Sequence, residues 1–264
     1  MTQAILWAAA GTGFTFLMTA LGASMVFFFR KGGSAAVQRI FLGFAAGVMI
    51  AASVWSLLIP AIEDAESLGM PGWLPAAGGF VLGVAFLMAM DRLLPHLHLG
   101  ADDPEGLPSS WKRTTLLVLA VTLHNIPEGM AVGLAFALAA EGNVGGGALS
   151  AAAALALGMG IQNFPEGAAV SLPLREEGLP AWKAFLYGSF SGLVELVFGV
   201  LVVLIAGGTQ PLMPWLLSFA AGAMLYVVVE ELIPEAHLGE HSHSGTLGVM
   251  AGFLIMMILD VALG

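Results

Sequence analysis

The sequence contains no cysteine and few charged residues. The absence of cysteine excludes disulfide bonds and thiolate metal ligands, so any metal site must use nitrogen and oxygen ligands. Only 10% of the residues are charged and 58% are hydrophobic, whereas soluble domains carry about 25% charged residues. The basic residues form no cluster of the kind that binds nucleic acid. The composition therefore indicates an integral membrane protein.

Apolar runs long enough to cross a membrane, about 20 residues each, can be placed eight times along the chain. The connections between them are short, so we predict an all-α polytopic membrane protein. Residues 1–264 then form a single transmembrane domain in contact with the lipid bilayer, with no soluble appendage. The expected helices cover residues 4–29, 40–62, 73–95, 114–140, 148–174, 181–206, 212–236 and 246–263.

The basic residues lie at alternate connections between these helices. Because cytoplasmic loops carry an excess of Lys and Arg, we expect the odd-numbered connections to be cytoplasmic. Both termini are then extracytoplasmic, and the protein is a multi-pass component of the plasma (cytoplasmic, or inner) membrane. The first, third and fifth connections are flanked in turn by Arg30, Lys31 and Arg39, by Arg92, Lys112 and Arg113, and by Arg175 and Lys183.

Two short strings recur far apart in the chain. FAAG occurs at residues 44–47 and 219–222, and LIP follows at residues 58–60 and 232–234. The copies lie in the second and seventh expected helices, which run in opposite directions, as in transporters built from inverted repeats. We therefore predict a 3+2+3 arrangement in which a central helix pair is flanked by two related groups of three.

Glycines recur at a spacing of four residues, as at Gly43 and Gly47 and at Gly129 and Gly133. Small residues at this spacing let helix backbones approach closely. Such pairs either pack helices together or form a smooth surface along which one bundle slides past another. The sequence leaves both interpretations open.

The string HNIPEG at residues 124–129 returns as QNFPEG at residues 162–167, within the central helix pair. On a helix, Glu128 lies between the directions of His124 and Asn125, and Glu166 lies between those of its own two partners. One carboxylate per helix can therefore serve two adjacent metal positions. The first is lined by His124, Glu128, Gln162 and Glu166; the second by Asn125, Glu128, Asn163, Glu166 and, from the sixth helix, Glu195.

Glu128, Glu166 and Glu195 lie near the middle of their helices without basic partners. Carboxylates in apolar surroundings are protonated and hydrogen-bonded, or they bind a cation that cancels their repulsion. Imidazole with oxygen ligands and no sulfur suits zinc first, and then iron(II), manganese and cadmium. Magnesium and calcium prefer sites made of oxygen alone, so His124 counts against them.

Acidic and imidazole side chains at the end of the seventh helix and in the connection after it predict metal binding on an exit path. Asp91, late in the third helix, could line the same path. His96 and His98, in the third connection, are expected to be solvated loop residues. The exit-path candidates after residue 229 are Glu230, Glu231, Glu235, His237, His241 and His243.

The paired motifs, Glu195 and the string EELIPE at residues 230–235 resemble the ZIP (Zrt/Irt-like) family of divalent metal transporters, bacterial branch, over essentially the whole chain. The resemblance implies eight helices, metal uptake into the cytoplasm and a two-metal central site at the residues named above. It also implies that the first, fourth, fifth and sixth helices move together. Some relatives have an acidic residue where this chain has Asn163, so the second position carries less negative charge here.

We therefore expect an importer of divalent transition metals that works by alternating access and has no cofactor besides the transported ion. A selective divalent cation channel using the same glutamates is the alternative. An intramembrane metalloenzyme is disfavoured, because the helix of His124 has no second histidine near it. Whether the chain forms a homodimer remains open.

Overall fold

The computed structural model describes residues 1–29, 35–97, 106–108, 112–141, 147–207, 210–236 and 243–263. Helices dominate these residues, which contain no β-strand, and the predicted all-α fold is confirmed. The longer helices are α1 (Thr2–Ala23), α2 (Ala35–Ala52), α4 (Trp73–Leu93), α5 (Arg113–Glu141), α6 (Ala148–Glu176), α7 (Ala181–Ala206), α8 (Met213–Val227) and α10 (Ser244–Leu263). Short segments extend them: η1 (Ser24–Phe27), η2 (Ser53–Leu58), α3 (Ile59–Ser67), η3 (Gln210–Leu212), η4 (Val228–Leu232) and α9 (Ile233–Glu235).

Seven helical segments of the described chain are long and apolar enough to cross a membrane. α6 is not among them, although it has 29 residues, because its apolar run is interrupted by Gln162, Asn163 and Glu166. It packs against α1, α2, α5, α7 and α10, so neighbouring helices surround the polar stretch. Large apolar side chains such as Leu82 and Ile258 are exposed on α4 and α10, as expected for surfaces that face lipid.

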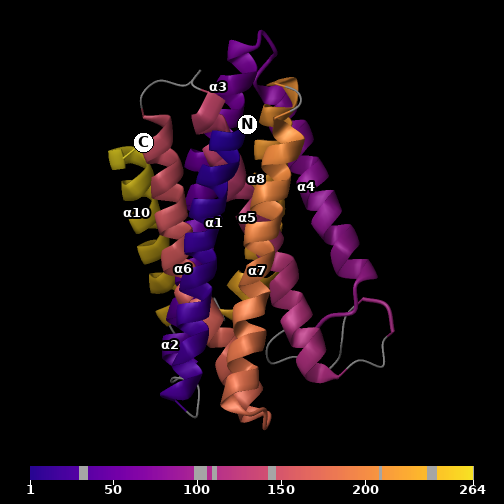
Figure 1. The fold of residues 1–264 in the computed structure, drawn as a ribbon, viewed down its shortest axis with the longest axis vertical. Coiled ribbons are helices and arrows are strands. Elements are labelled where there is room, and N and C mark those ends of the chain that lie inside the picture. The colour runs from indigo at the N-terminus through magenta and orange to yellow at the C-terminus, as the bar shows by residue number, and fades with distance from the viewer. Residues whose placement is uncertain are drawn as a thin grey trace.

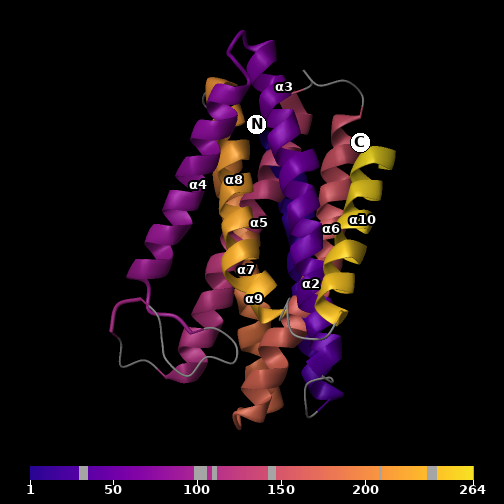
Figure 2. The same ribbon diagram turned by 180° about the vertical axis from the view of Figure 1, so that it is seen from behind.

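The helices form two groups. α1, α5, α6 and α7 make their most extensive contacts with one another, and α2 pairs with α10 as α4 pairs with α8. α4 and α10 lie at opposite flanks of the molecule (Figures 1 and 2). The groups meet where α6 lies against α2 and α10 and where α5 lies against α8. The central pair of the predicted arrangement, α5 and α6, therefore borders both groups.

The glycine pairs lie inside these groups. Gly43 and Gly47 face the backbone of α10, and Gly129 and Gly133 face the backbone of α7. A Cβ atom at any of these four positions would overlap the neighbouring backbone, so glycine is required for the close approach. In this structure these pairs pack helices together within a group, and they do not line the contact between the groups.

The two copies of the LIP string share an unusual backbone. η2 and η4 are π-helical, and each is followed at once by an Ile-Pro pair, Ile59-Pro60 or Ile233-Pro234. A proline cannot donate a hydrogen bond to the carbonyl four residues earlier, and its ring clashes with that carbonyl, so a wider helical turn fits there. In the predicted inverted repeat, α2 corresponds to α8 and α10 corresponds to α4. The pairing of α2 with α10 therefore matches the pairing of α8 with α4, and the helix contacts support the repeat.

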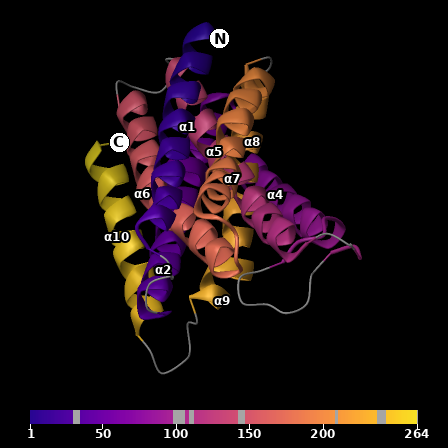
Figure 3. The ribbon, with the colours of Figure 1, turned by 60° about the horizontal axis from the view of Figure 1, so that its bottom comes forward.

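The chain begins and α10 ends at the same end of the bundle (Figure 1). The described basic residues gather toward the opposite end, which Figure 3 brings forward. We call this the basic end, defined by residues that lie near the ends of helices or next to them: Arg39, Arg92, Lys112, Arg175 and Lys183.

Candidate metal site

The repeated motif lies on α5 and α6, where each helix contains a proline, Pro127 or Pro165. His124 and Glu166 are partly exposed, whereas the other polar side chains of the motif are almost fully buried, and so is Glu195 on α7. Polar groups in such surroundings are costly unless they have partners. The relative exposures are 1% for Asn125, 2% for Glu128 and 0% for Gln162, Asn163 and Glu195.

An amide network holds Glu195 in place. Asn163 Nδ2 donates hydrogen bonds to both carboxylate oxygens of Glu195, at 2.9 and 2.8 Å. Thr19 Oγ1 on α1 donates to the same carboxylate at a longer 3.4 Å. Gln162 Nε2 in turn donates to Asn163 Oδ1 at 3.1 Å. The network ties α1, α6 and α7 together around one carboxylate.

Sequence reasoning missed Thr19, although a signal was present. Thr12, Thr15 and Thr19 follow one face of α1 at helical spacing, and all three are buried. A buried threonine stripe on an otherwise apolar helix marks the face that meets polar neighbours. The stripe did not reveal which carboxylate it meets, because α1 and α7 are far apart in the chain.

Three buried oxygens of the motif have no hydrogen-bond partner in the described structure: Asn125 Oδ1, Glu128 Oε2 and Gln162 Oε1. Asn125 uses its nitrogen instead, donating to the carbonyl of Ser191 on α7 at 3.1 Å. Buried polar atoms in proteins are nearly always paired, so each exception calls for an explanation. An oxygen that accepts no hydrogen bond can bind a cation, and these oxygens come from both copies of the motif.

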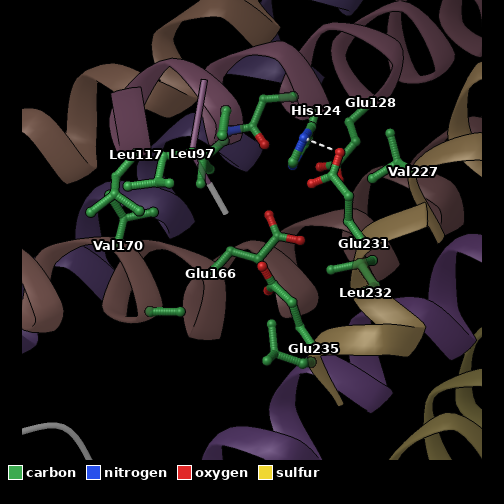
Figure 4. A pocket seen from close by; sticks show the side chains of 15 residues that line it. Leu97, Leu117, His124, Glu128, Glu166, Val170, Val227, Glu231, Leu232 and Glu235 are labelled. Atoms are coloured by element: carbon green, nitrogen blue, oxygen red, sulfur yellow. Dashed lines mark ion pairs between the residues drawn. The ribbon is translucent and has the colours of Figure 1, made fainter. Parts of the chain in front are cut away.

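A cavity of about 50 Å³ lies beside the motif (Figure 4). His124, Glu128, Glu166, Glu231 and Glu235 line it together with apolar side chains, and none of its lining residues is Lys or Arg. Its other walls include residues at the start of α5 and the segment before it, at the basic end. The cavity thus has acidic walls and lies on the side of the motif toward the basic end.

Glu231 lies closer to the motif than expected. It is 5% exposed, and its carboxylate forms an ion pair with His124 Nε2. Figure 4 shows His124, Glu166, Glu231 and Glu235 around the same space. Of the exit-path candidates, Glu231 and Glu235 therefore line the cavity that contains His124.

The other exit-path candidates lie elsewhere or cannot be placed. Glu230 and His243 are exposed, and neither lines this cavity. Asp91 does not line it either; its carboxylate accepts a hydrogen bond from Tyr226 at 3.3 Å and lies 2.9 Å from His96 Nε2. His237 and His241 lie outside the described residues, as does His98.

The expectation that His96 is a solvated loop residue is wrong, because its side chain is 1% exposed. Nδ1 lies 2.8 Å from the carbonyl oxygen of Leu94, while Nε2 meets Asp91. The next residue, Leu97, donates its backbone N–H to Leu116 of α5 at 3.3 Å. The chain after α4 thus folds back against α5 and buries the imidazole.

In the described residues, no group of three or more His, Asp or Glu side chains is arranged closely enough to hold a metal ion. His124 is turned to Glu231, and Glu195 is held by Asn163. In the described structure, the imidazole of His124 and the carboxylate of Glu195 thus both have protein partners.

The model of the ZIP zinc transporter family matches residues 101–260, which include both copies of the motif and Glu195. The chain belongs to this family. Zinc transporter ZIP11 of Homo sapiens is 39% identical to it, over 99% of this chain and 98% of its own length. Zinc transporter ZIPB of Bordetella bronchiseptica is 42% identical over 99% of this chain and 81% of its own length, and zinc transporter GufA of Myxococcus xanthus is 40% identical over 80% and 81%.

The resemblance to the ZIP family is thereby confirmed. Family membership places the chain among membrane transporters and not among enzymes. It also agrees with the polytopic helical fold and the apolar surface.

Proposed function

We propose that this protein imports zinc, and with it related divalent transition metals, across the cytoplasmic membrane into the cell. The observation that carries the proposal is the set of unpaired buried oxygens on Asn125, Glu128 and Gln162 beside an acidic cavity. The names of the relatives point to zinc, and His124 among oxygen ligands suits zinc better than magnesium or calcium. The metal is the transported substrate and not a resident cofactor.

The proposed site has two positions that share the carboxylates of Glu128 and Glu166. His124 joins the first position when it releases Glu231, and Glu195 joins the second when it releases Asn163. Carboxamides at both positions, from Gln162, Asn125 and Asn163, make them weaker than a structural zinc site. That weakness suits transport, because the ion must leave.

The basic end gives the orientation of the chain in the membrane. By the positive-inside rule this end is cytoplasmic, so both termini are extracytoplasmic. The acidic cavity runs from Glu128 toward this end and ends near Glu235, on the route that an ion leaving for the cytoplasm would take. An inside-negative potential favours entry of each charge by about 2.3 kcal/mol per 100 mV, and a divalent ion gains twice that.

Alternating access is the proposed mechanism. Close glycine contacts hold α5 to α7 and α2 to α10, so each helix group can move as a unit. The moving unit would be α1, α5, α6 and α7, which carry the whole site. The other group, with its paired π-helical segments, would serve as the frame. A channel would instead need a continuous path past Glu128.

Uptake by the purified protein in sealed vesicles tests this proposal. Zinc should enter in a saturable manner, iron(II), manganese and cadmium should compete, and Glu128→Ala should abolish uptake. Glu177→Ala, which removes a carboxylate at an exposed residue outside the cavity, is the control and should retain uptake. Normal uptake by the Glu128→Ala protein would exclude the central site.

Cysteine labelling separates the carrier from the channel, since the chain has no native cysteine. Val121→Cys lines the cavity on the basic side of His124, and Leu155→Cys lies buried on the other side of the motif. For a carrier, added metal should change the labelling of the two cysteines in opposite directions. Labelling of both at once, from both sides and unaffected by metal, would establish a channel.

A further inference from the structure

A second cavity, of about 440 Å³, lies between α2 on one side and η1 and α6 on the other. It shares Leu42, Glu166 and Ala169 with the acidic cavity, so these residues stand between the two spaces. Its volume is within the range of small-molecule binding sites, about 300–1,000 Å³. The acidic cavity, at about 50 Å³, has room only for a few waters or an ion.

The charged side chains that line this larger cavity are all acidic. Its walls are mostly apolar side chains, among them Phe41, Phe164 and Leu172, and its charged residues are Glu166 and Glu176. None of the residues that line it is Lys, Arg or His. The two glutamates are ten residues apart on α6, which corresponds to about 15 Å along the helix. A molecule with one positive charge and an apolar body complements these walls, and an anion is repelled.

The cavity opens at the surface near the basic end. Phe29, Val37 and Phe41 line it, and their side chains are 51%, 42% and 43% exposed. Arg39, which helps to define the basic end, lies between Val37 and Phe41 on α2, so the opening lies close to the membrane interface. An amphiphilic molecule has its polar group at that interface and its apolar part in the bilayer, so it can reach this opening. Glu166 then meets its charged group from the side opposite the acidic cavity.

We propose that this cavity is a binding site for amphiphilic amines, with the ammonium group at Glu166 and the apolar body between Phe41 and Leu172. Such a ligand occupies one carboxylate of the candidate metal site and at the same time lies between the two helix groups. Binding itself does not depend on metal transport. Its consequence, inhibition of uptake from the membrane side, rests on the proposed function.

Three probes of the same shape test the charge preference: 4-phenylbutylamine, 4-phenylbutanol and 4-phenylbutyrate. Each is titrated against the full-length purified protein in metal-free detergent buffer, and the thermal unfolding midpoint is followed. The amine should bind at least tenfold more tightly than the alcohol, and the carboxylate should not bind. Equal binding of amine and alcohol would overturn the proposal and favour a site for lipid acyl chains.

Three variants locate the binding. Ala168→Phe fills the larger cavity without touching the acidic one and should abolish the shift caused by the amine. Ala85→Phe adds the same volume to an exposed position of α4 and should leave it unchanged. Glu166→Gln should reduce amine binding to the level of the alcohol. Unchanged amine binding in the Ala168→Phe or the Glu166→Gln protein overturns the assignment, and the second variant decides if the first does not fold.

Uptake measured in vesicles then separates this inference from the proposed function. The amine should slow zinc uptake by the wild-type and Ala85→Phe proteins at the concentrations at which it binds. If the protein binds the amine as predicted but moves no metal, the proposed function fails and the binding site stands. If metal is taken up but the amine binds no better than the alcohol, the function stands and the binding site fails.

Discussion

Replacement of Asn163 by aspartate tests how the buried network and the second metal position depend on each other. The Asn163 carboxamide donates hydrogen bonds to both carboxylate oxygens of Glu195, at 2.9 and 2.8 Å, in a fully buried place. Asn163→Asp removes both donors and sets a second carboxylate against the first. The same change supplies an acidic ligand at the proposed second metal position.

The two effects have opposite signs. A hydrogen bond to a charged group contributes about 1.5–3 kcal/mol, so loss of the pair should lower the free energy of unfolding without metal by about 3 kcal/mol. Two unit charges 4 Å apart attract by about 4 kcal/mol at an effective dielectric constant of 20. If about half of this survives the rearrangement of the network, metal affinity rises by about 2 kcal/mol, close to 30-fold.

Thermal unfolding without metal and calorimetric titration with zinc or cadmium measure both quantities. Asn163→Ala removes the donors without adding charge, so it should be destabilised without binding metal more tightly. The double variant Asn163→Asp with Glu195→Gln exchanges donor and acceptor at constant charge, so stability and affinity should both return toward wild type. An Asn163→Asp protein that is as stable as wild type without metal, and binds no more tightly, would refute this account of the network.

Two further changes test the packing by thermal unfolding. Gly22→Ala places a methyl group against the backbone of α6 and should lower the free energy of unfolding by about 1–3 kcal/mol. In Gly13→Ala no atom of another helix lies within 4 Å of the new methyl group, so the stability should be unchanged or slightly higher. Equal midpoints for these two variants would contradict the close approach of α1 and α6. His96→Ala leaves Asp91 without its imidazole partner and should cost about 1–3 kcal/mol, while His243→Ala, at an exposed residue, should have no effect. Identical stability of both histidine variants would mean that His96 is not buried as described.

The spans of the helices could be predicted from the sequence because long apolar runs admit few alternatives in a membrane. The run predicted at residues 181–206 is α7, and the runs at 73–95 and 246–263 differ from α4 and α10 by at most two residues at an end. The apolar run predicted at residues 148–174 is α6, which begins at the same residue and ends two residues later, although its polar motif interrupts that run.

The contacts between side chains of different helices could not be predicted in the same way. Helical spacing tells which residues share a face, but it does not tell which other helix that face meets. The motif therefore predicted the direction of Glu128 relative to His124, while the ion pair of His124 with Glu231 depends on how α5 packs beside η4. The same limit explains His96, whose burial depends on a connection that folds back against α5.

The two groups of helices that the inverted repeat relates have similar contacts, whereas the two copies of the central motif differ in their side chains. Asp91 on α4 and Asp260 on α10 occupy corresponding places: the first accepts a hydrogen bond from Tyr226, just before η4, and the second from Ser56 in η2 at 2.6 Å. The frame is thus braced by similar contacts toward opposite ends of the bundle. The central motif has lost this symmetry, because an imidazole stands at position 124 and a carboxamide at 162. In the proposed transport the ion therefore meets unequal ligands, and only the position that includes His124 prefers zinc to ions that bind oxygen alone.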